Sequence, residues 1–86
     1  MPHITSLDKT KYNHIINAIF SSQIIETKGD LEFLVYQLMK KYMSSRPRKY
    51  LTLHDAVYGT IHSAEEFKRL HLDKRENEAI SENGEA

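Results

Sequence analysis

Five basic residues lie within ten positions of one another in the middle of the chain, with no acidic residue among them. They are interleaved with two tyrosines, and the full set is Lys40, Lys41, Tyr42, Arg46, Arg48, Lys49 and Tyr50. Arginine and lysine bind phosphate oxygens, and tyrosine rings stack on bases. The stretch is therefore a candidate site for a nucleotide or a nucleic-acid backbone. The alternative is a solubilising loop at a helix C-terminus, where cations interact favourably with the helix dipole.

The remaining polar residues form no pattern typical of catalysis or metal binding. His54 and His62 are eight positions apart, too far to share a metal ion, which needs several converging ligands. Glu65 and Glu66 are adjacent, so on a helix their side chains point about 100° apart. The sequence has no phosphate loop and no nucleophile with an obvious base. We therefore expect no catalytic residue, no metal and no cofactor, and a protein that is not an enzyme.

Composition limits the possible functions further. The chain has 86 residues, with 12 basic and 12 acidic residues and no cysteine. Residues 1–50 carry a balance of +4 and residues 51–86 a balance of −4. Nucleic-acid binders are usually basic overall, so the neutral total favours a small anionic ligand over DNA or RNA. The opposite charges of the two halves are equally compatible with pairing between helices or between copies of the chain.

Length and hydropathy predict one domain, residues 1–86, away from membranes. No apolar run approaches the roughly 18 residues needed to span a bilayer, and the first residues lack the pattern of a signal peptide. We expect a cytoplasmic protein, of a bacterium or of a cell infected by a phage.

The elements that would position the basic stretch are helices. The central one, residues 31–44, has apolar residues at helical spacing on one face and more bulk on a neighbouring face. A helix with so wide an apolar surface needs cover on two sides, and small chains without disulfides often gain stability by association. We therefore predict a homo-oligomer, most simply a two-fold dimer, whose contact includes Leu31, Phe33, Leu34, Val35, Tyr36, Leu38, Met39 and Met43.

Two further helices complete an all-α fold. An isoleucine-rich amphipathic helix over residues 8–25, capped by Ser6 or Asp8, forms an antiparallel hairpin with the central helix. Gly29 is expected to stop the first helix in the left-handed conformation and Asp30 to cap the second. A third helix, capped by Thr52, covers residues 52–72. Residues 76–86 are expected to form a flexible acidic tail.

Four motifs resemble those of a family of short uncharacterised proteins, a domain of unknown function, encoded by bacteria and tailed phages. They are Met1-Pro2-His3-Ile4, Gly29-Asp30-Leu31-Glu32-Phe33, Val57-Tyr58-Gly59-Thr60-Ile61 with Glu66-Phe67-Lys68-Arg69, and Glu82-Asn83-Gly84-Glu85. The resemblance implies a small helical protein, plausible in a phage or mobile element. It carries no catalytic residues over to this chain.

These observations favour a non-enzymatic, homo-oligomeric protein-interaction or regulatory module, for which a host protein is a candidate partner. The first alternative is an oligomer that sequesters a small anionic ligand such as a nucleotide signal. The second alternative is nucleic-acid binding through residues 40–50, which would weaken steeply as salt is raised.

Overall fold

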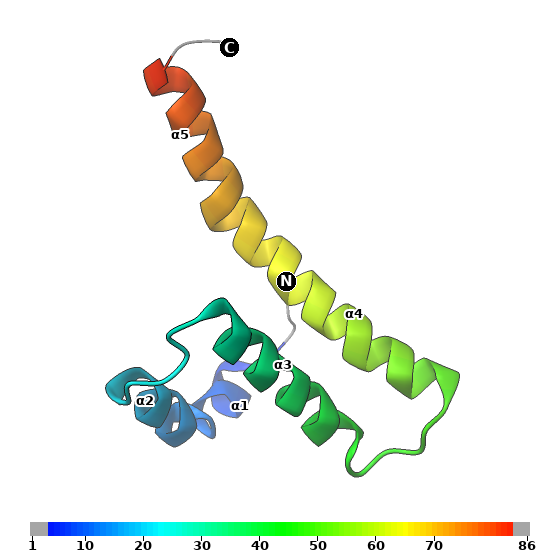
Figure 1. The fold of residues 1–86 in the computed structure, drawn as a ribbon. Helices are drawn as coiled ribbons and strands as arrows, with labels where there is room; N and C mark the ends of the chain where they lie inside the picture. Colours follow the sequence, from blue (N-terminus) through cyan, green and yellow to red (C-terminus); the bar gives the residue numbers. More distant parts are fainter. Residues whose placement is uncertain (1–3, 84–86) are drawn as a thin grey trace.

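The structure is a computed structural model that describes residues 4–83, with side chains described as far as residue 80 (Figure 1). Every regular element in this range is a helix, which confirms the all-α class. In chain order the elements are α1 (Ser6–Thr10), α2 (Asn13–Ser21), α3 (Lys28–Met43), α4 (Tyr50–Phe67), the π-helical segment η1 (Lys68–Leu72) and α5 (Asp73–Asn83).

The first predicted helix, residues 8–25, is two short helices instead. Thr5, not Ser6 or Asp8, caps α1, because its hydroxyl accepts the Asp8 backbone N–H at 3.1 Å. The helix is interrupted by a turn at Lys11 and Tyr12, where the Tyr12 N–H donates to the Lys9 carbonyl oxygen, three residues back, at 3.1 Å. The helix α2 ends at Ser21, four residues before the predicted boundary. There the Ser21 and Ser22 hydroxyls donate to carbonyls of the preceding turn, a competition that weakens helix continuation.

The turn between α2 and α3 is built differently from the prediction. Gly29 lies inside the first turn of α3, and the residue with positive φ is Ile25, at 57°. Thr27 caps α3 by accepting the Asp30 N–H at 3.0 Å, and the Asp30 carboxylate accepts the Thr27 N–H at 3.2 Å. This reciprocal capping box satisfies N–H groups that have no partner within the helix. It also moves the start of α3 to Lys28.

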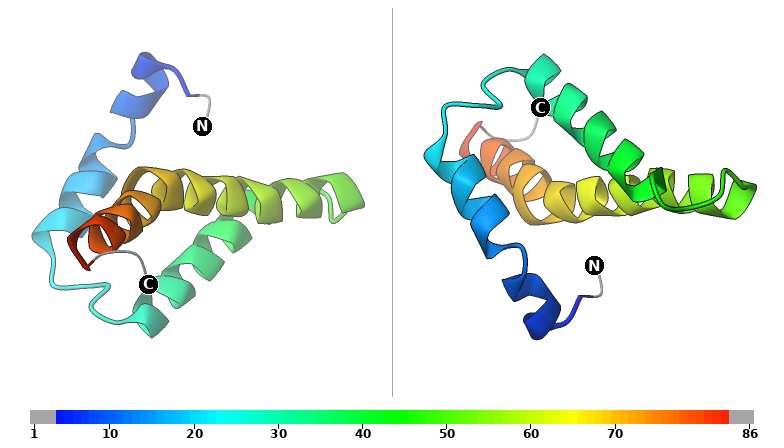
Figure 2. Two further views of the ribbon diagram at one scale, coloured as in Figure 1. Left: turned by 90° about the horizontal axis from the view of Figure 1, so that it is seen from above. Right: turned by 90° about the horizontal axis from the view of Figure 1, so that it is seen from below.

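Helix pairing also differs from the expected hairpin. The helix α3 packs against α4. The helices α1 and α2 diverge from α3, and the linker of residues 22–27 lies where the two directions meet (Figure 2). The extended Ser22, with ψ of 151°, and the left-handed Ile25 send the chain sideways instead of back along α2. The isoleucine-rich helix is therefore not packed along the central helix as predicted.

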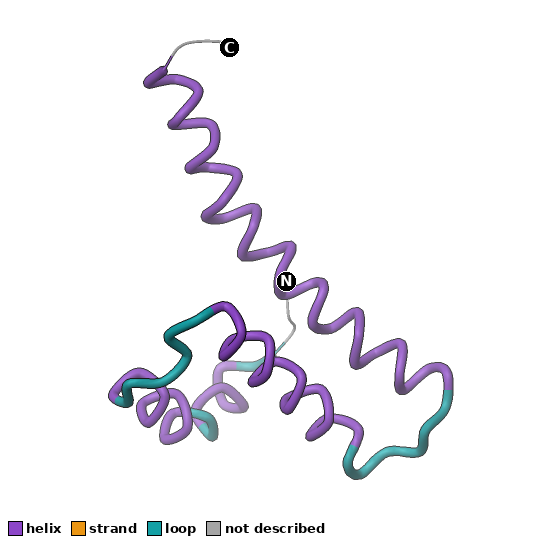
Figure 3. The backbone as a smooth tube through the Cα atoms, in the orientation of Figure 1, coloured by secondary structure: helices purple, strands orange, loops and turns teal. Residues whose placement is uncertain are grey.

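The third helix begins earlier and continues further than predicted. Lys49 is the N-cap of α4, and Thr52 lies within the first turn, where its hydroxyl accepts the Lys49 N–H at 3.2 Å. Beyond residue 72, where an end was expected, the backbone stays helical through η1 and α5 without a break (Figure 3). Helix therefore occupies much of the predicted tail. Residues 84–86 lie outside the described residues, and the mobility of the tail stays a prediction.

Very little of the described chain is buried. Ala56, at the α3–α4 contact, is the sole described residue with a buried side chain. The accessible surface is 7937 Å², whereas a folded monomer of this size exposes about 5300 Å². The radius of gyration is 16.6 Å, whereas a compact domain of this length has about 12 Å. The single chain is thus an open arrangement of helices with one local contact.

Candidate functional site

The predicted interface on α3 divides into two groups. Leu34, Val35, Met39 and Met43 are half-buried, and the last two line concavities between α3 and α4. The other four residues are exposed: Leu31 by 51%, Phe33 by 65%, Tyr36 by 60% and Leu38 by 60%. The two groups differ in exposure and not in position, because Tyr36 and Leu38 also line the concavities between α3 and α4. Nothing in the single chain tests the predicted contact between copies.

The helix α2 presents a second apolar surface. Ile15, Ile16 and Phe20 are 58%, 46% and 86% exposed, and Ile19 is half-buried. The sequence pattern identified this apolar face correctly. The structure adds that no helix within residues 4–83 packs along this face.

Arg46 does not point freely into solvent. Its guanidinium carbon lies 3.7 Å from the centre of the Tyr42 ring, and its Nη1 donates to the Tyr42 carbonyl oxygen. This carbonyl belongs to the last turn of α3, where backbone oxygens lack partners within the helix. Stacking on the ring adds a cation–π attraction. In this structure Arg46 therefore closes the C-terminal end of α3.

Two of the other predicted site residues come together on one side of the α3–α4 contact. Lys40 and Arg48 both line a concavity of about 220 Å³, along with the exposed ring of Tyr36. The Lys40 Nζ lies 5.8 Å from the centre of that ring. Tyr42 lines a different concavity, of about 180 Å³, with Asp55. Lys41, Lys49 and Tyr50 line neither of these concavities, so the predicted stretch does not form a single site.

A row of aromatic rings along α4 was not recognised from the sequence. Tyr50, His54, Tyr58 and His62 follow one another at i, i+4 spacing, and their successive ring centres are 5.6, 4.2 and 6.1 Å apart. His54 and Tyr58 are stacked, with 24° between their planes. The i, i+4 spacing was the signal in the sequence that could have identified this row. Because the rings partly cover one another, their faces are less available for stacking on a base.

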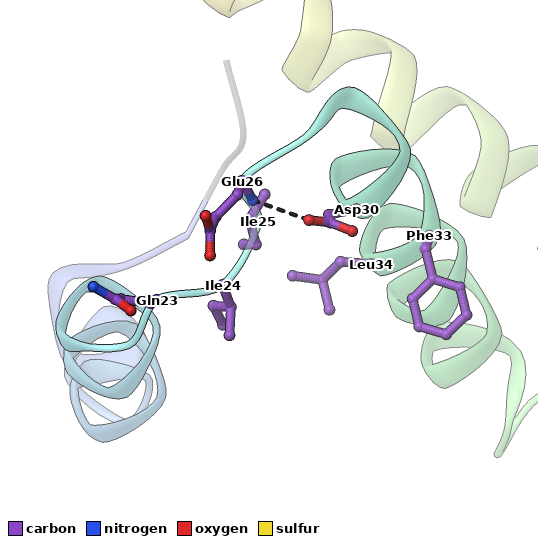
Figure 4. A pocket seen from close by; sticks show the side chains of 7 residues that line it. All are labelled: Gln23, Ile24, Ile25, Glu26, Asp30, Phe33 and Leu34. Carbon is purple, nitrogen blue, oxygen red and sulfur yellow. Dashed lines mark hydrogen bonds between the residues drawn. The ribbon is translucent and has the colours of Figure 1, made fainter.

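The linker before α3 forms a further concavity, of about 420 Å³, which the sequence did not indicate (Figure 4). Ile24 and Leu34 point into the space between the linker and α3, and Phe33 lies on its α3 side. The Asp30 carboxylate accepts a hydrogen bond from the Glu26 N–H at 3.1 Å. The concavity is mostly apolar and open, which suits an apolar side chain better than a polar ligand.

Two ion pairs on the long helix shift the titration of their members. Arg69 Nη2 lies 2.7 Å from Glu66 Oε1, and this hydrogen bond lowers the pKa of Glu66. Lys68 Nζ lies 2.6 Å from Asp73 Oδ1, and this hydrogen bond raises the pKa of Lys68. The Glu66–Arg69 pair has the i, i+3 spacing that stabilises a helix, whereas the Lys68–Asp73 pair spans the π-helical segment.

The described part of the chain holds neither a cluster of metal-binding side chains nor a helix suited to a membrane. There, no three histidine, aspartate or glutamate side chains come together in a way that could hold a metal ion. In the same residues, no helix is both long and apolar enough to cross a membrane.

Comparison with known proteins places the whole chain in one family. Residues 1–86 match a family described as a domain of unknown function, DUF6899. The chain belongs to this family. The resemblance to an uncharacterised family, which the sequence motifs indicated, is thereby confirmed. No curated protein and no solved structure matches the chain. Since the family description assigns no activity, the function must be argued from the surfaces of this chain.

Proposed function

We propose that this protein is a small non-enzymatic helical module that works as a homo-oligomer, most simply a two-fold dimer, in the cytoplasm. Its role is to bind or regulate another protein, in a phage or mobile-element setting. The observation that carries this proposal is the open single chain. Its accessible surface exceeds that of a compact monomer of this size by roughly 2600 Å².

The size of this excess fits a permanent assembly. If two copies each buried roughly 2600 Å², the total would be roughly 5000 Å², at the upper end of the range for obligate homodimers. Such interfaces resemble a domain core cut in half, and the exposed apolar faces of α2 and α3 have that character. Association would thus supply the core that one chain lacks.

Native mass spectrometry of the purified protein, together with light scattering after gel filtration, tests this proposal. We expect a dimer or a larger closed oligomer at micromolar concentration, with no monomer peak of comparable intensity. A monomer with stable helical circular dichroism at the same concentration would overturn the proposal. The same spectra would show any retained small molecule as added mass.

A second candidate function is favoured by one specific observation. Lys40 and Arg48 line a common concavity beside the Tyr36 ring, an arrangement that suits a small anionic ligand with an aromatic group, such as a nucleotide. Arg46, which the sequence analysis included in this site, is engaged with Tyr42 in this structure. The nucleic-acid alternative gains no comparable observation and stays a prediction.

A pair of double variants separates this candidate from general electrostatic attraction. Lys40→Ala with Arg48→Ala removes both cations of the concavity, whereas Lys41→Ala with Lys49→Ala removes equal charge outside it. Calorimetric titration with a panel of linear and cyclic nucleotides should show binding abolished by the first pair and retained by the second. Equal affinity in both double variants, or no nucleotide binding to the unmodified protein, would remove this candidate.

A further inference from the structure

The face of α4 that meets α3 continues past the end of the contact. Leu53, Ala56 and Thr60 lie on this face, and they line the two concavities between α3 and α4. Helical spacing of three or four residues carries the same face onward to Ala64 and Phe67. Phe67 is 65% exposed, so its own chain does not cover this continuation.

The π-helical segment η1 lies directly beyond Phe67 and changes the rotational register of the helix. The Asp73 N–H donates to the Lys68 carbonyl oxygen, five residues back, and the Lys68–Asp73 ion pair spans the same turn. A π-turn holds one residue more than an α-turn and often marks a functional site. Each residue after η1 therefore lies where the preceding residue would lie in an uninterrupted α-helix.

This shift exchanges His71 and Glu78 on the face for Leu72 and Ala79, while a charged residue, Lys74 or Arg75, lies between the two positions in either register. An uninterrupted α-helix would continue the face from Phe67 to His71 and Glu78. With the additional residue in η1, Leu72 and Ala79 occupy those places instead. Leu72 is 48% exposed and Ala79 is half-buried. We call the resulting row the distal stripe, defined as Ala64, Phe67, Leu72 and Ala79.

No other helix of the chain packs against the distal stripe. The helix α5 projects away from α1, α2 and α3 (Figure 1), and α3 is the only helix outside the long α4–η1–α5 rod that packs on it among the described residues. No helix in the described part of the chain packs on the apolar face of α2 either. Within the described residues, one chain therefore holds two exposed surfaces with apolar side chains that it does not bring together.

We propose that α2 of a second copy packs on the distal stripe, and that the exchange is reciprocal. This inference rests on the proposed homo-oligomer and specifies its contact. With nine residues, α2 is about 14 Å long, and the distal stripe is about 22 Å long, so one α2 fits along it. A two-fold axis satisfies both surfaces at once, because each copy donates one α2 and receives one.

Exchange through α2 also explains the shape of the linker. Ser22 is extended, the chain bends at residues 22, 23 and 27, and Ile25 has a φ of 57°. This left-handed conformation is uncommon for a β-branched residue, and it directs α2 away from α3. Pairing of the distal stripe with itself would leave the α2 isoleucines exposed, so it accounts for less of the excess surface.

Cysteine cross-linking tests the contact against a clean background, because the natural chain has no cysteine. Protein carrying Ile16→Cys is mixed with protein carrying Phe67→Cys, unfolded and refolded together, and exposed to a mild oxidant. We expect a disulfide-linked mixed dimer. Leu51→Cys is the matched control, because Leu51 is 72% exposed and lies on the opposite side of the long helix. Mixed with Ile16→Cys protein, it should form at least tenfold less disulfide-linked dimer than Phe67→Cys does. Stronger linkage of Phe67→Cys to itself than to Ile16→Cys would overturn the proposal.

Changing the register of the long helix gives an independent test that leaves both apolar surfaces chemically intact. Deleting His71 removes the additional residue of η1 and keeps the distal stripe aligned, so the dimer dissociation constant should change less than threefold. Inserting one alanine after Leu70 turns Leu72 and Ala79 by about 100° about the helix axis. The dimer dissociation constant should then rise at least tenfold. Circular dichroism would verify that both variants keep their helix content. Wild-type affinity in the insertion variant would overturn the proposal.

These experiments distinguish failure of the proposed homo-oligomer from failure of the proposed α2 contact. If native mass spectrometry finds only monomer, the proposed homo-oligomer is wrong. If it finds a stable oligomer but the mixed cross-link is missing and the insertion has no effect, the homo-oligomer stands and the α2 contact is wrong.

Discussion

At the scale of single residues, the helices begin where side-chain oxygens satisfy backbone N–H groups. The clearest case is Thr27 with Asp30, each of which accepts a backbone N–H of the other. The sequence analysis assigned the cap to Asp30 alone, because it placed the turn at Gly29. The threonine-to-aspartate spacing was visible in the sequence, but the left-handed residue, Ile25, was not a residue type that predicts this conformation.

We expect Thr27→Ala to lower the free energy of unfolding by about 1 kcal/mol, because the Asp30 N–H loses its acceptor. Thr27→Ser keeps the hydroxyl and is the matched control. Urea unfolding followed by circular dichroism, at one fixed protein concentration, measures the difference. Equal loss in the alanine and serine variants would show that the methyl group, not the cap, is what matters.

A titration experiment tests the Glu66–Arg69 pair. The hydrogen bond from Arg69 lowers the pKa of Glu66 below its ordinary value of 4.5. Since the folded pKa is the lower one, the pair stabilises the fold above pH 4.5, and this stabilisation is lost as pH falls through the folded pKa. Arg69→Ala should raise the pKa of Glu66 toward 4.5, as measured by carboxyl NMR, while Arg75→Ala should leave it unchanged. A Glu66 pKa unaffected by Arg69→Ala would contradict the assignment.

At the scale of elements, the helical segments were predictable because their signals are local. Apolar residues at i, i+3 and i+4 spacing indicated all the helical regions up to residue 72. The continuation into α5 was missed because residues 73–83 are mostly polar. A helix there depends on local pairs such as Lys68–Asp73 and Arg75–Glu78, not on an apolar face.

Gly59 tests the packing of α4. A glycine inside a helix can allow close approach of another backbone, but a Cβ at Gly59 would meet nothing within 4 Å in this structure. Gly59→Ala should therefore stabilise the protein by about 0.5–1 kcal/mol through lower unfolded-state entropy. Thermal unfolding would measure the change. Ser63→Ala, a substitution to alanine in the same helix that does not replace a glycine, is the control. Destabilisation would mean that another molecule approaches α4 at this point.

At the scale of the whole molecule, the open chain makes stability depend on association. If the folded core forms only in the oligomer, unfolding and dissociation are coupled. A hundredfold increase in protein concentration should then add about 2.7 kcal/mol to the apparent stability and raise Tm by several degrees. Calorimetric scans at two concentrations measure this. A Tm independent of concentration would show that one chain is stable alone.

The candidate ligand site shows that the sequence indicates which side chains could bind an anion but not which of them lie close together. The basic stretch was found from its composition, but its seven residues divide among α3, the following loop and α4. Arg46 folds back on Tyr42, while Lys40 and Arg48 meet across a concavity. Which cations converge depends on how the chain turns at Pro47, a property of the α3–α4 packing and not of the spacing between the basic residues.

The sequence by itself determined that this chain is helical and that it carries more apolar surface than one helix pair can bury, because both properties follow from local spacing and composition. Only the tertiary structure decided that α3 pairs with α4 instead of α2, and that η1 aligns Leu72 and Ala79 with Phe67. Pairing depends on the direction of the linker at Ile25. The alignment of Leu72 and Ala79 with Phe67 depends on one hydrogen bond to a carbonyl five residues back. The spacing of apolar residues along the sequence indicates neither the linker direction nor this hydrogen bond.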